Sequence, residues 1–343
     1  MAAGWVSDPS PALSVLDLVP VRSDQSTADA LAATRRLARV ADELGFRRYW
    51  VAEHHNLPAV AATNPPVLVA MVAAATEQIR VGSGGVMLPN HAPLVVAEQF
   101  GMLEALHPGR IDLGIGRAPG TDQKTARALR RTEAGLSAEN FPQELTELIK
   151  YFEGTAELNA VPAAGNKPPI WLLGSSGYSA QAAGLLGLPF AFAHHFSGIH
   201  TLPALARYRE TFREGGLLTK PYAMVTVQAI CAPTDDEASR IALPAALSFL
   251  RLRQGNPGRL PPPEQAAAHR WTTEEQVFVQ QRRDGQAIGG PDTVRAALAR
   301  LLATTEADEL MITTQVHDPQ QRIRSIELVR GLFDDVPLGL QQG

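Results

Sequence analysis

A carboxylate and two imidazoles follow one another in the segment Glu53-His54-His55-Asn56, directly after the apolar run 48–52. If that run is a strand of a parallel barrel, at least one imidazole stands at the mouth where such barrels bind ligands. An imidazole there can exchange protons near neutral pH. The alternative is a capping or solvent-exposed pair, and the segment alone favours neither. Because adjacent side chains diverge and no His-Glu-x-x-His spacing occurs, a metal site is disfavoured.

Two further polar features accompany apolar runs. The segment Phe192-Ala-His194-His195-Phe196 ends the run 189–193 and again predicts imidazoles at the mouth, with a packed loop anchor as the alternative. Asp17 lies inside the run 13–19, where we expect it to point inward, with no role that the sequence assigns.

Glycines interrupt two neighbouring runs. Gly82-Ser-Gly84-Gly85 lies within the run 79–88, where glycine weakens a strand unless something approaches the backbone closely. A flat ligand ring would be one such reason, and a bulge that redirects the strand is the alternative. Gly114-Ile-Gly116-Arg117 ends the run 110–115. The forked guanidinium of Arg117 suits a phosphate or carboxylate, and a salt bridge to a nearby loop is the alternative.

A candidate anion site lies in Leu173-Gly174-Ser175-Ser176-Gly177-Tyr178, which leads from an apolar run into a helical pattern. Backbone N–H groups and the dipole at a helix N-terminus attract phosphate. Capping of the helix by Ser175 or Ser176 is the alternative. Capping alone does not require a glycine on each side, so the pattern favours the anion site.

The elements that must position these residues alternate along the chain. Short apolar runs predict eight strands and longer periodic patterns predict intervening helices. This alternation is typical of a TIM (β/α)8 barrel. A doubly wound open sheet fits less well, because residues 20–24 after the first strand contain no glycine-rich turn. Strands are expected at 13–19, 48–52, 79–88, 110–115, 169–173, 189–193, 222–230 and 309–313, and helices at 28–45, 66–77, 93–106, 141–151, 178–186, 202–212, 235–252, 293–302 and 320–333.

We therefore expect one α/β domain over residues 1–343, with a barrel core at about 12–335 and insertion loops at about 121–137 and 255–290. Apolar residues make up 45% of the chain and charged residues 19%, which suffices for a large core. The net charge of −4 gives no reason to expect nucleic acid or membrane as a partner. A single cysteine, Cys231, and an N-terminus unlike a signal peptide favour a cytoplasmic location.

Four segments together resemble the bacterial luciferase-like family of flavin-dependent monooxygenases. They are 49–56 (YWVAEHHN), 81–93 (VGSGGVMLPNHAP), 107–120 (HPGRIDLGIGRAPG) and 173–178 (LGSSGY), with 192–196 (FAHHF) as a further match. With the strand and helix pattern around them, the resemblance extends over about residues 12–335. As a set these motifs are specific, although each alone is weak.

The resemblance implies a TIM barrel, a homodimer packed through the early helices, and FMN at the carboxyl-end mouth. It implies a cis peptide between Gly84 and Gly85 beneath the flavin ring, with Val86 beside them, and it aligns the family's catalytic histidine with His54. Phosphate contacts fall on Arg117, Ser175 and Tyr178, within the wider set Gly174, Ser175, Ser176, Gly177 and Tyr178. Luciferase carries a cysteine where this chain has Gly116, so that thiol chemistry does not carry over.

The function implied is a two-component monooxygenase that receives reduced FMN from a separate flavin reductase and uses O2 to oxidise a small organic substrate. Glu53, His55, His194 and His195 are expected at the substrate end of the mouth. Two alternatives stay open at this point. One is a deazaflavin-dependent oxidoreductase, and the other is a non-catalytic flavin-binding paralogue. The resemblance does not imply light emission.

Overall fold

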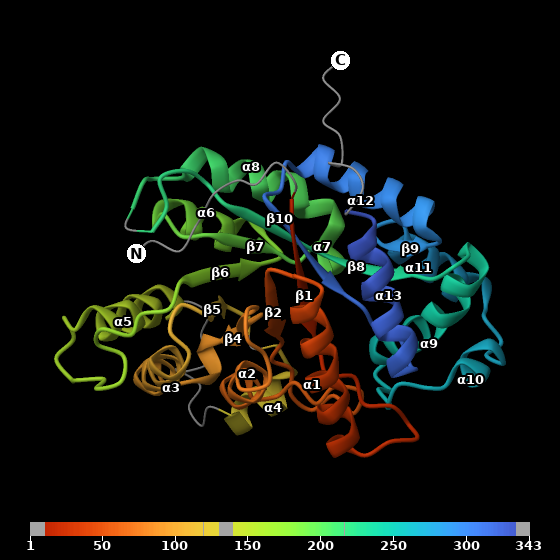
Figure 1. The fold of residues 1–343 in the computed structure, drawn as a ribbon, viewed down its shortest axis with the longest axis horizontal. Coiled ribbons are helices and arrows are strands. Elements are labelled where there is room, and N and C mark those ends of the chain that lie inside the picture. Colours follow the sequence, from red (N-terminus) through yellow and green to blue (C-terminus); the bar gives the residue numbers. More distant parts are fainter. Residues whose placement is uncertain (1–10, 119, 130–139, 216, 334–343) are drawn as a thin grey trace.

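The computed structural model describes residues 11–118, 120–129, 140–215 and 217–333. Their strands form one parallel sheet that closes on itself, because β10 pairs with both β1 and β8 (Figure 1). The prediction of a TIM barrel is confirmed. The strands are β1 (Ala12–Asp17), β2 (Arg48–Val51), β3 (Arg80–Ser83), β4 (Val86–Met87), β5 (Ile111–Gly116), β6 (Ile170–Gly174), β7 (Phe190–Phe192), β8 (Ala223–Cys231), β9 (Ala287–Gly289) and β10 (Glu309–Thr313).

Helices surround this barrel on its outer face (Figure 1). Within the described ranges none of them is long and apolar enough to cross a membrane. The α-helices are α1 (Thr27–Glu43), α2 (Pro65–Ala73), α3 (Pro93–Leu106), α4 (Gln123–Leu129), α5 (Phe141–Glu153), α6 (Gly177–Leu185), α7 (His194–Ser197), α8 (Thr201–Thr211), α9 (Asp235–Arg253), α10 (Pro263–Ala267), α11 (Thr273–Arg283), α12 (Pro291–Thr305) and α13 (Pro319–Gly331), and the 3-10 turns are η1 (Leu88–Asn90) and η3 (Gly198–His200).

The predicted third strand is divided. Residues 79–88 form β3 and β4, separated by a cis peptide bond between Gly84 and Gly85, as the family resemblance implies. Both pieces pair with β5, so they count as one strand of the barrel. The short strand β9 pairs with β8 and adds an element that the sequence pattern does not predict.

A layer of charged side chains lies inside the barrel, toward the amino-terminal ends of the strands. The guanidinium of Arg48 binds Asp112 at 2.8 Å and Glu309 at 3.0 Å, and all three side chains are almost completely buried. Tyr222 donates a further hydrogen bond to Glu309, at 2.8 Å. Each buried charge therefore has a partner of opposite sign, which limits the cost of removing it from water.

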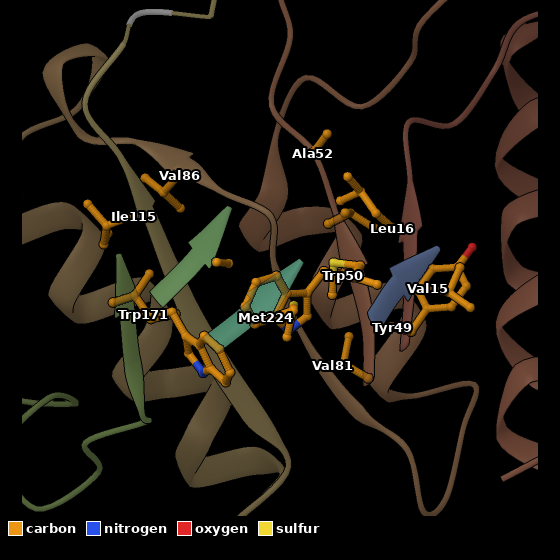
Figure 2. Packing of buried hydrophobic residues seen from close by; sticks show 14 of the residues in the cluster. Val15, Leu16, Tyr49, Trp50, Ala52, Val81, Val86, Ile115, Trp171 and Met224 are labelled. Carbon is orange, nitrogen blue, oxygen red and sulfur yellow. The ribbon is translucent and has the colours of Figure 1, made fainter. Parts of the chain in front are cut away.

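Large apolar side chains fill the next layer toward the strands' carboxyl ends. Figure 2 shows Leu16, Trp50, Trp171 and Met224 projecting from different strands into the middle of the barrel. The rings of Trp50 and Trp171 meet edge to face, with centroids 5.1 Å apart. This layer fills the barrel interior and forms the floor of the space at the strands' carboxyl ends, with Leu16 facing that space.

Both predicted insertions contain regular structure. In the first, α4 covers Gln123–Leu129, while residues 130–137 lie outside the described residues. The second, expected as a loop, instead carries α10 and α11 and ends in β9. A capping box formed by Thr272 and Glu275 starts α11 and satisfies its first backbone N–H groups.

The expectation that Asp17 points inward is wrong. Its carboxylate accepts hydrogen bonds from Thr34 of α1 at 2.7 Å and from Arg322 of α13 at 2.7 Å, so it faces the helix layer. Tyr49 of β2 also donates to it, at 2.5 Å. Asp17 follows Leu16 along β1, so their side chains point to opposite faces of the sheet. The side chain of Leu16 occupies the barrel interior. The carboxylate joins the barrel wall to two helices.

Candidate functional site

Two adjoining cavities open at the carboxyl ends of the barrel strands. The inner cavity has a volume of about 240 Å³ and the outer cavity about 470 Å³. Both lie in or near the size range of small-molecule pockets. The residues that line both cavities, and so form their common boundary, are Leu18, His54, Gly120, His195 and Phe196.

His54 stands on this boundary, just beyond the end of β2. Its Nδ1 lies 3.3 Å from the carbonyl oxygen of Gly120, so Nδ1 carries the proton and donates it. Burial lowers the pKa of His54 below 6.5, which keeps the imidazole neutral at pH 7. The other nitrogen, Nε2, then has a lone pair with which to accept a proton.

Glu53 is a buried structural anchor. Its carboxylate accepts hydrogen bonds from the backbone N–H of Met87 at 2.9 Å, from Asn90 at 3.0 Å, from His91 at 2.9 Å and from His55 at 3.0 Å. Burial raises the pKa of Glu53, but these hydrogen bonds outweigh it and lower the pKa to about 2. Glu53 lines neither cavity, whereas His55 lines the outer one while held by Glu53.

The backbone of Gly84 forms part of the inner cavity's wall. A Cβ added to Gly84 would lie 2.6 Å from Cδ1 of Leu16, and one added to Gly85 would lie 2.7 Å from the carbonyl oxygen of Gly114. Packing against the backbone thus requires a glycine at position 85, whereas a side chain at position 84 would displace the tip of Leu16. Gly85 and the buried Val86, which the resemblance places at the cofactor with Gly84, do not line the cavity.

Cationic and hydroxyl groups meet at one end of the inner cavity, where β5 and β6 end. Arg117, Gly174, Ser175 and Ser176 line it, and the guanidinium carbon of Arg117 lies 4.1 Å from the ring centroid of Tyr178. Ser176 is the N-cap residue of α6, but its side chain makes no capping hydrogen bond. The capping alternative is therefore not what the structure shows for Ser176.

The first turn of α6 is open. A Cβ added to Gly177, the first residue of the helix, would meet no atom within 4 Å. Free backbone N–H groups, the helix dipole and a nearby guanidinium together form a suitable site for a phosphate.

The two histidines of the second pair, His194 and His195, lie in different surroundings. His195 lines both cavities, and its Nδ1 lies 3.3 Å from the carbonyl oxygen of Thr226. Burial lowers the pKa of His195 to about 3, so its Nε2 is an unprotonated acceptor, buried and without a hydrogen-bond partner in the described structure. His194 instead bonds Thr201 at 2.7 Å and lines neither cavity.

The inner cavity therefore combines apolar walls, a neutral boundary imidazole, an unsatisfied acceptor and an anion corner. None of the described residues that line it is a carboxylate. Such a site fits a flat, partly polar ring that carries a phosphate. The unsatisfied Nε2 of His195 can accept a hydrogen bond from a ring N–H, and the backbone N–H groups of residues 174–177 can donate to the phosphate.

Sequence reasoning missed several residues of this site. Leu16, Thr226 and Met311 line the inner cavity, and Gln228 and Arg282 line the outer one. The first three lie on strands with inward-facing positions, so strand alternation could have found them. Nothing local in the sequence indicates that Arg282 reaches the mouth. Cys231 is buried, burial raises its pKa to about 11, and it lines neither cavity.

Comparisons with known proteins agree with this architecture. The model of a family described as luciferase-like monooxygenase matches residues 12–309. An Escherichia coli K12 protein named luciferase-like monooxygenase is 44% identical over 96% of this chain and 99% of its own length. The N-acetyl-S-alkylcysteine monooxygenase of Bacillus subtilis is 34% identical over 92% of this chain and 96% of its own length.

Solved structures share the fold. The crystal structure of apo-MsnO8 superposes with a TM-score of 0.86 at 36% identity, covering 95% of this chain and 99% of that one. More distant structures include an FMN complex of 3,6-diketocamphane monooxygenase from Pseudomonas putida (TM-score 0.71, 20% identity, 94% and 98% covered) and a coenzyme F420-dependent reductase from Methanopyrus kandleri (TM-score 0.65, 15% identity, 94% and 97% covered). At such identities the likeness shows the fold alone.

Proposed function

Because the chain belongs to the luciferase-like monooxygenase family, we propose that it is an FMN-dependent monooxygenase that receives reduced FMN from a separate reductase and uses O2 to oxidise a small organic substrate. The observation that carries this proposal is the pair of cavities that meet at His54 and His195. A cofactor in the inner cavity and a substrate in the outer cavity would meet at that boundary.

The inner cavity provides the cofactor seat in this proposal. Arg117, Ser175, Ser176 and the open first turn of α6 would hold the FMN phosphate, and the backbone at Gly84 would support the ring. His195 would accept a hydrogen bond at Nε2, which has no other partner in the described structure. When bound and reduced, FMN supplies the electrons that activate O2 for transfer of one oxygen atom to the substrate.

His54 has the protonation state and position needed for proton transfer. Its neutral Nε2 would take a proton at the boundary, while the Gly120 carbonyl fixes the ring through Nδ1. An imidazole held in one tautomer is an effective general base, because its lone pair is already correctly placed. Leu18 and Phe196 line the same boundary, and their apolar side chains would limit the access of water to the reacting centre.

The experiment compares cofactors first and oxygen chemistry second. The protein is titrated anaerobically with oxidised FMN, reduced FMN and deazaflavin, and oxygen uptake and incorporation of label from ¹⁸O2 are then measured with candidate substrates. We expect reduced FMN to bind and one labelled oxygen atom to enter the product. Tight deazaflavin binding without FMN binding would replace this proposal with a deazaflavin-dependent oxidoreductase. FMN binding without any oxygen-dependent turnover across the substrates would favour a non-catalytic paralogue.

His54→Ala tests the proton-transfer role within the same assay. We expect turnover to fall by about 10²-fold or more, the usual scale for a lost general base, while FMN affinity changes little. His200→Ala is the matched control, because this exposed histidine lines neither cavity. Unchanged turnover in His54→Ala would remove this residue from the mechanism.

A homodimer packed through the early helices is a further part of the proposal. Val67 on α2 and Val95, Met102 and Leu106 on α3 are large apolar side chains exposed on the surface. Apolar residues gathered on neighbouring helices favour a protein interface. Light scattering after size exclusion should give twice the chain mass of 36.8 kDa, and a monomer at micromolar concentration would contradict this part.

A further inference from the structure

A guanidinium without a carboxylate partner reaches the outer cavity. Arg282 of α11 is half-buried, and it forms no ion pair within the described part of the chain. Its guanidinium carbon lies 3.6 Å from the ring centroid of Phe249, and its Nη2 lies 3.4 Å from the side-chain oxygen of Gln228. These two contacts leave most of its five N–H donors unused.

The protein satisfies this cation only in part. The Gln228 oxygen already accepts a shorter hydrogen bond, 3.0 Å, from Gln286. Burial alone lowers the pKa of Arg282 to about 10, and no neighbouring carboxylate counteracts it. The side chain is still charged at neutral pH. A half-buried cation that packs on an aromatic ring but has no anionic partner can be neutralised by a ligand.

The remaining wall of the outer cavity is mostly apolar. Leu57, Val60, Phe249, Leu252 and Leu260 line it. The ionisable groups that share the cavity with Arg282 are His54, His55, His195 and Asp122.

Asp122 is already occupied by its own neighbours. It accepts from Asn56 at 3.2 Å and from Thr125 at 2.7 Å, and hydrogen bonds led by Thr125 lower its pKa to about 2. This exposed carboxylate is not an ion-pair partner of Arg282. An incoming anion would thus find a fork of donors at one point of an apolar chamber.

We propose that the substrate has a compact apolar body and one carboxylate, and that Arg282 binds this carboxylate in the outer cavity. A planar carboxylate matches the donor fork of a guanidinium, whereas a neutral polar group uses it poorly. With the carboxylate held at Arg282, the apolar body is left to extend along the apolar wall toward the boundary at His54 and His195. Oxidation then falls on the apolar body, and the carboxylate takes no part in the reaction. That the bound anion is a substrate rests on the proposed function, whereas the anion site itself does not.

The test measures binding to the full chain by calorimetry, with no flavin added. The probes are three acid and amide pairs: butanoate and butanamide, octanoate and octanamide, and phenylacetate and phenylacetamide. In at least one pair the acid should bind about tenfold to a hundredfold more tightly, the range for a charge-assisted contact. Arg282→Gln should abolish that preference, and Arg282→Lys should keep part of it because the charge is retained.

Arg283→Gln is the matched control. Arg283 follows directly, donates to Ser239 at 2.9 Å and does not line the outer cavity, so its loss should leave the acid preference intact. Thermal unfolding of each variant checks that the fold is retained. Equal binding of acid and amide by the wild type in all three pairs, or a preference that survives in Arg282→Gln, would overturn the inference.

Binding of reduced FMN, measured on the same proteins, keeps this result separate from the proposed function. If reduced FMN binds but no acid preference exists, the anion site is wrong and the proposed function stands. If the acid preference exists but reduced FMN does not bind, the anion site stands and the proposed function is wrong.

Discussion

Acidification should destabilise this protein in part through one side chain, His195. Burial lowers its pKa to about 3, from the usual 6.5, and this effect outweighs the hydrogen bond from Nδ1 to the Thr226 carbonyl, which raises the pKa. Between these two values the unfolded chain binds a proton that the folded chain does not. The free energy of unfolding therefore falls as the pH falls below 6.5, and the loss stops only near pH 3.

The size of the effect follows from this difference in proton binding. At pH 7 most unfolded chains carry a neutral imidazole, and at pH 5 nearly all carry a charged one. Linkage then gives a loss of about 2 kcal/mol between pH 7 and pH 5 from this one group. That result does not depend on the exact folded pKa, provided it lies well below 5.

His195→Asn removes the titration while keeping an amide that can donate to the Thr226 carbonyl. Urea unfolding, followed by far-ultraviolet circular dichroism, gives the free energy of unfolding at both pH values. The decrease between pH 7 and pH 5 should be smaller in the variant by about 2 kcal/mol. Replacing the exposed His200 by Asn controls for the loss of an imidazole as such and should show the wild-type decrease. If His195→Asn and wild type lose equal stability on acidification, His195 is not a buried neutral imidazole.

Three further predictions concern the anion corner and the barrel interior. Arg117→Gln should weaken FMN binding by about tenfold to a hundredfold and leave riboflavin binding nearly unchanged, because only FMN has a phosphate; equal loss for both ligands in fluorescence titrations would contradict the assignment. Ser176→Ala should cost little stability, since its side chain makes no capping bond, whereas Thr234→Ala, which removes a cap from α9, should cost about 1 kcal/mol in urea unfolding; similar losses would be inconsistent with the two caps described. Arg48→Met should destabilise the barrel by about 3–5 kcal/mol, because it leaves the buried Glu309 without its cation and Asp112 with Arg80 alone. A loss below about 1 kcal/mol in the same assay would show that these carboxylates do not depend on Arg48.

The sequence predicted the barrel well because its signals are local. Alternation of apolar runs with helical periods marks each strand and helix, and the glycines at 84 and 85 mark the divided third strand. The histidine at position 54 was placed at the mouth by its position after β2, and the structure has it lining both cavities. Such features depend on neighbours within a few residues.

Long-range contacts account for what the sequence could not predict. Glu53 was expected at the substrate end, but it is buried under hydrogen bonds from His91 and Asn90, nearly forty residues away. Asp17 was expected inside the barrel, but Arg322 holds it in the helix layer. Arg282 reaches the outer cavity only because α11 packs beside α9. None of these partners can be identified from local spacing.

The most direct test of the central claim is a crystal structure of the protein with FMN. We predict the ring in the inner cavity, against the backbone of Gly84 and within hydrogen-bond reach of His195, with the phosphate at Ser175, Ser176 and Arg117. The outer cavity should remain open to solvent and connect with the ring at His54. FMN bound in the outer cavity, or a phosphate placed away from the first turn of α6, would contradict the account.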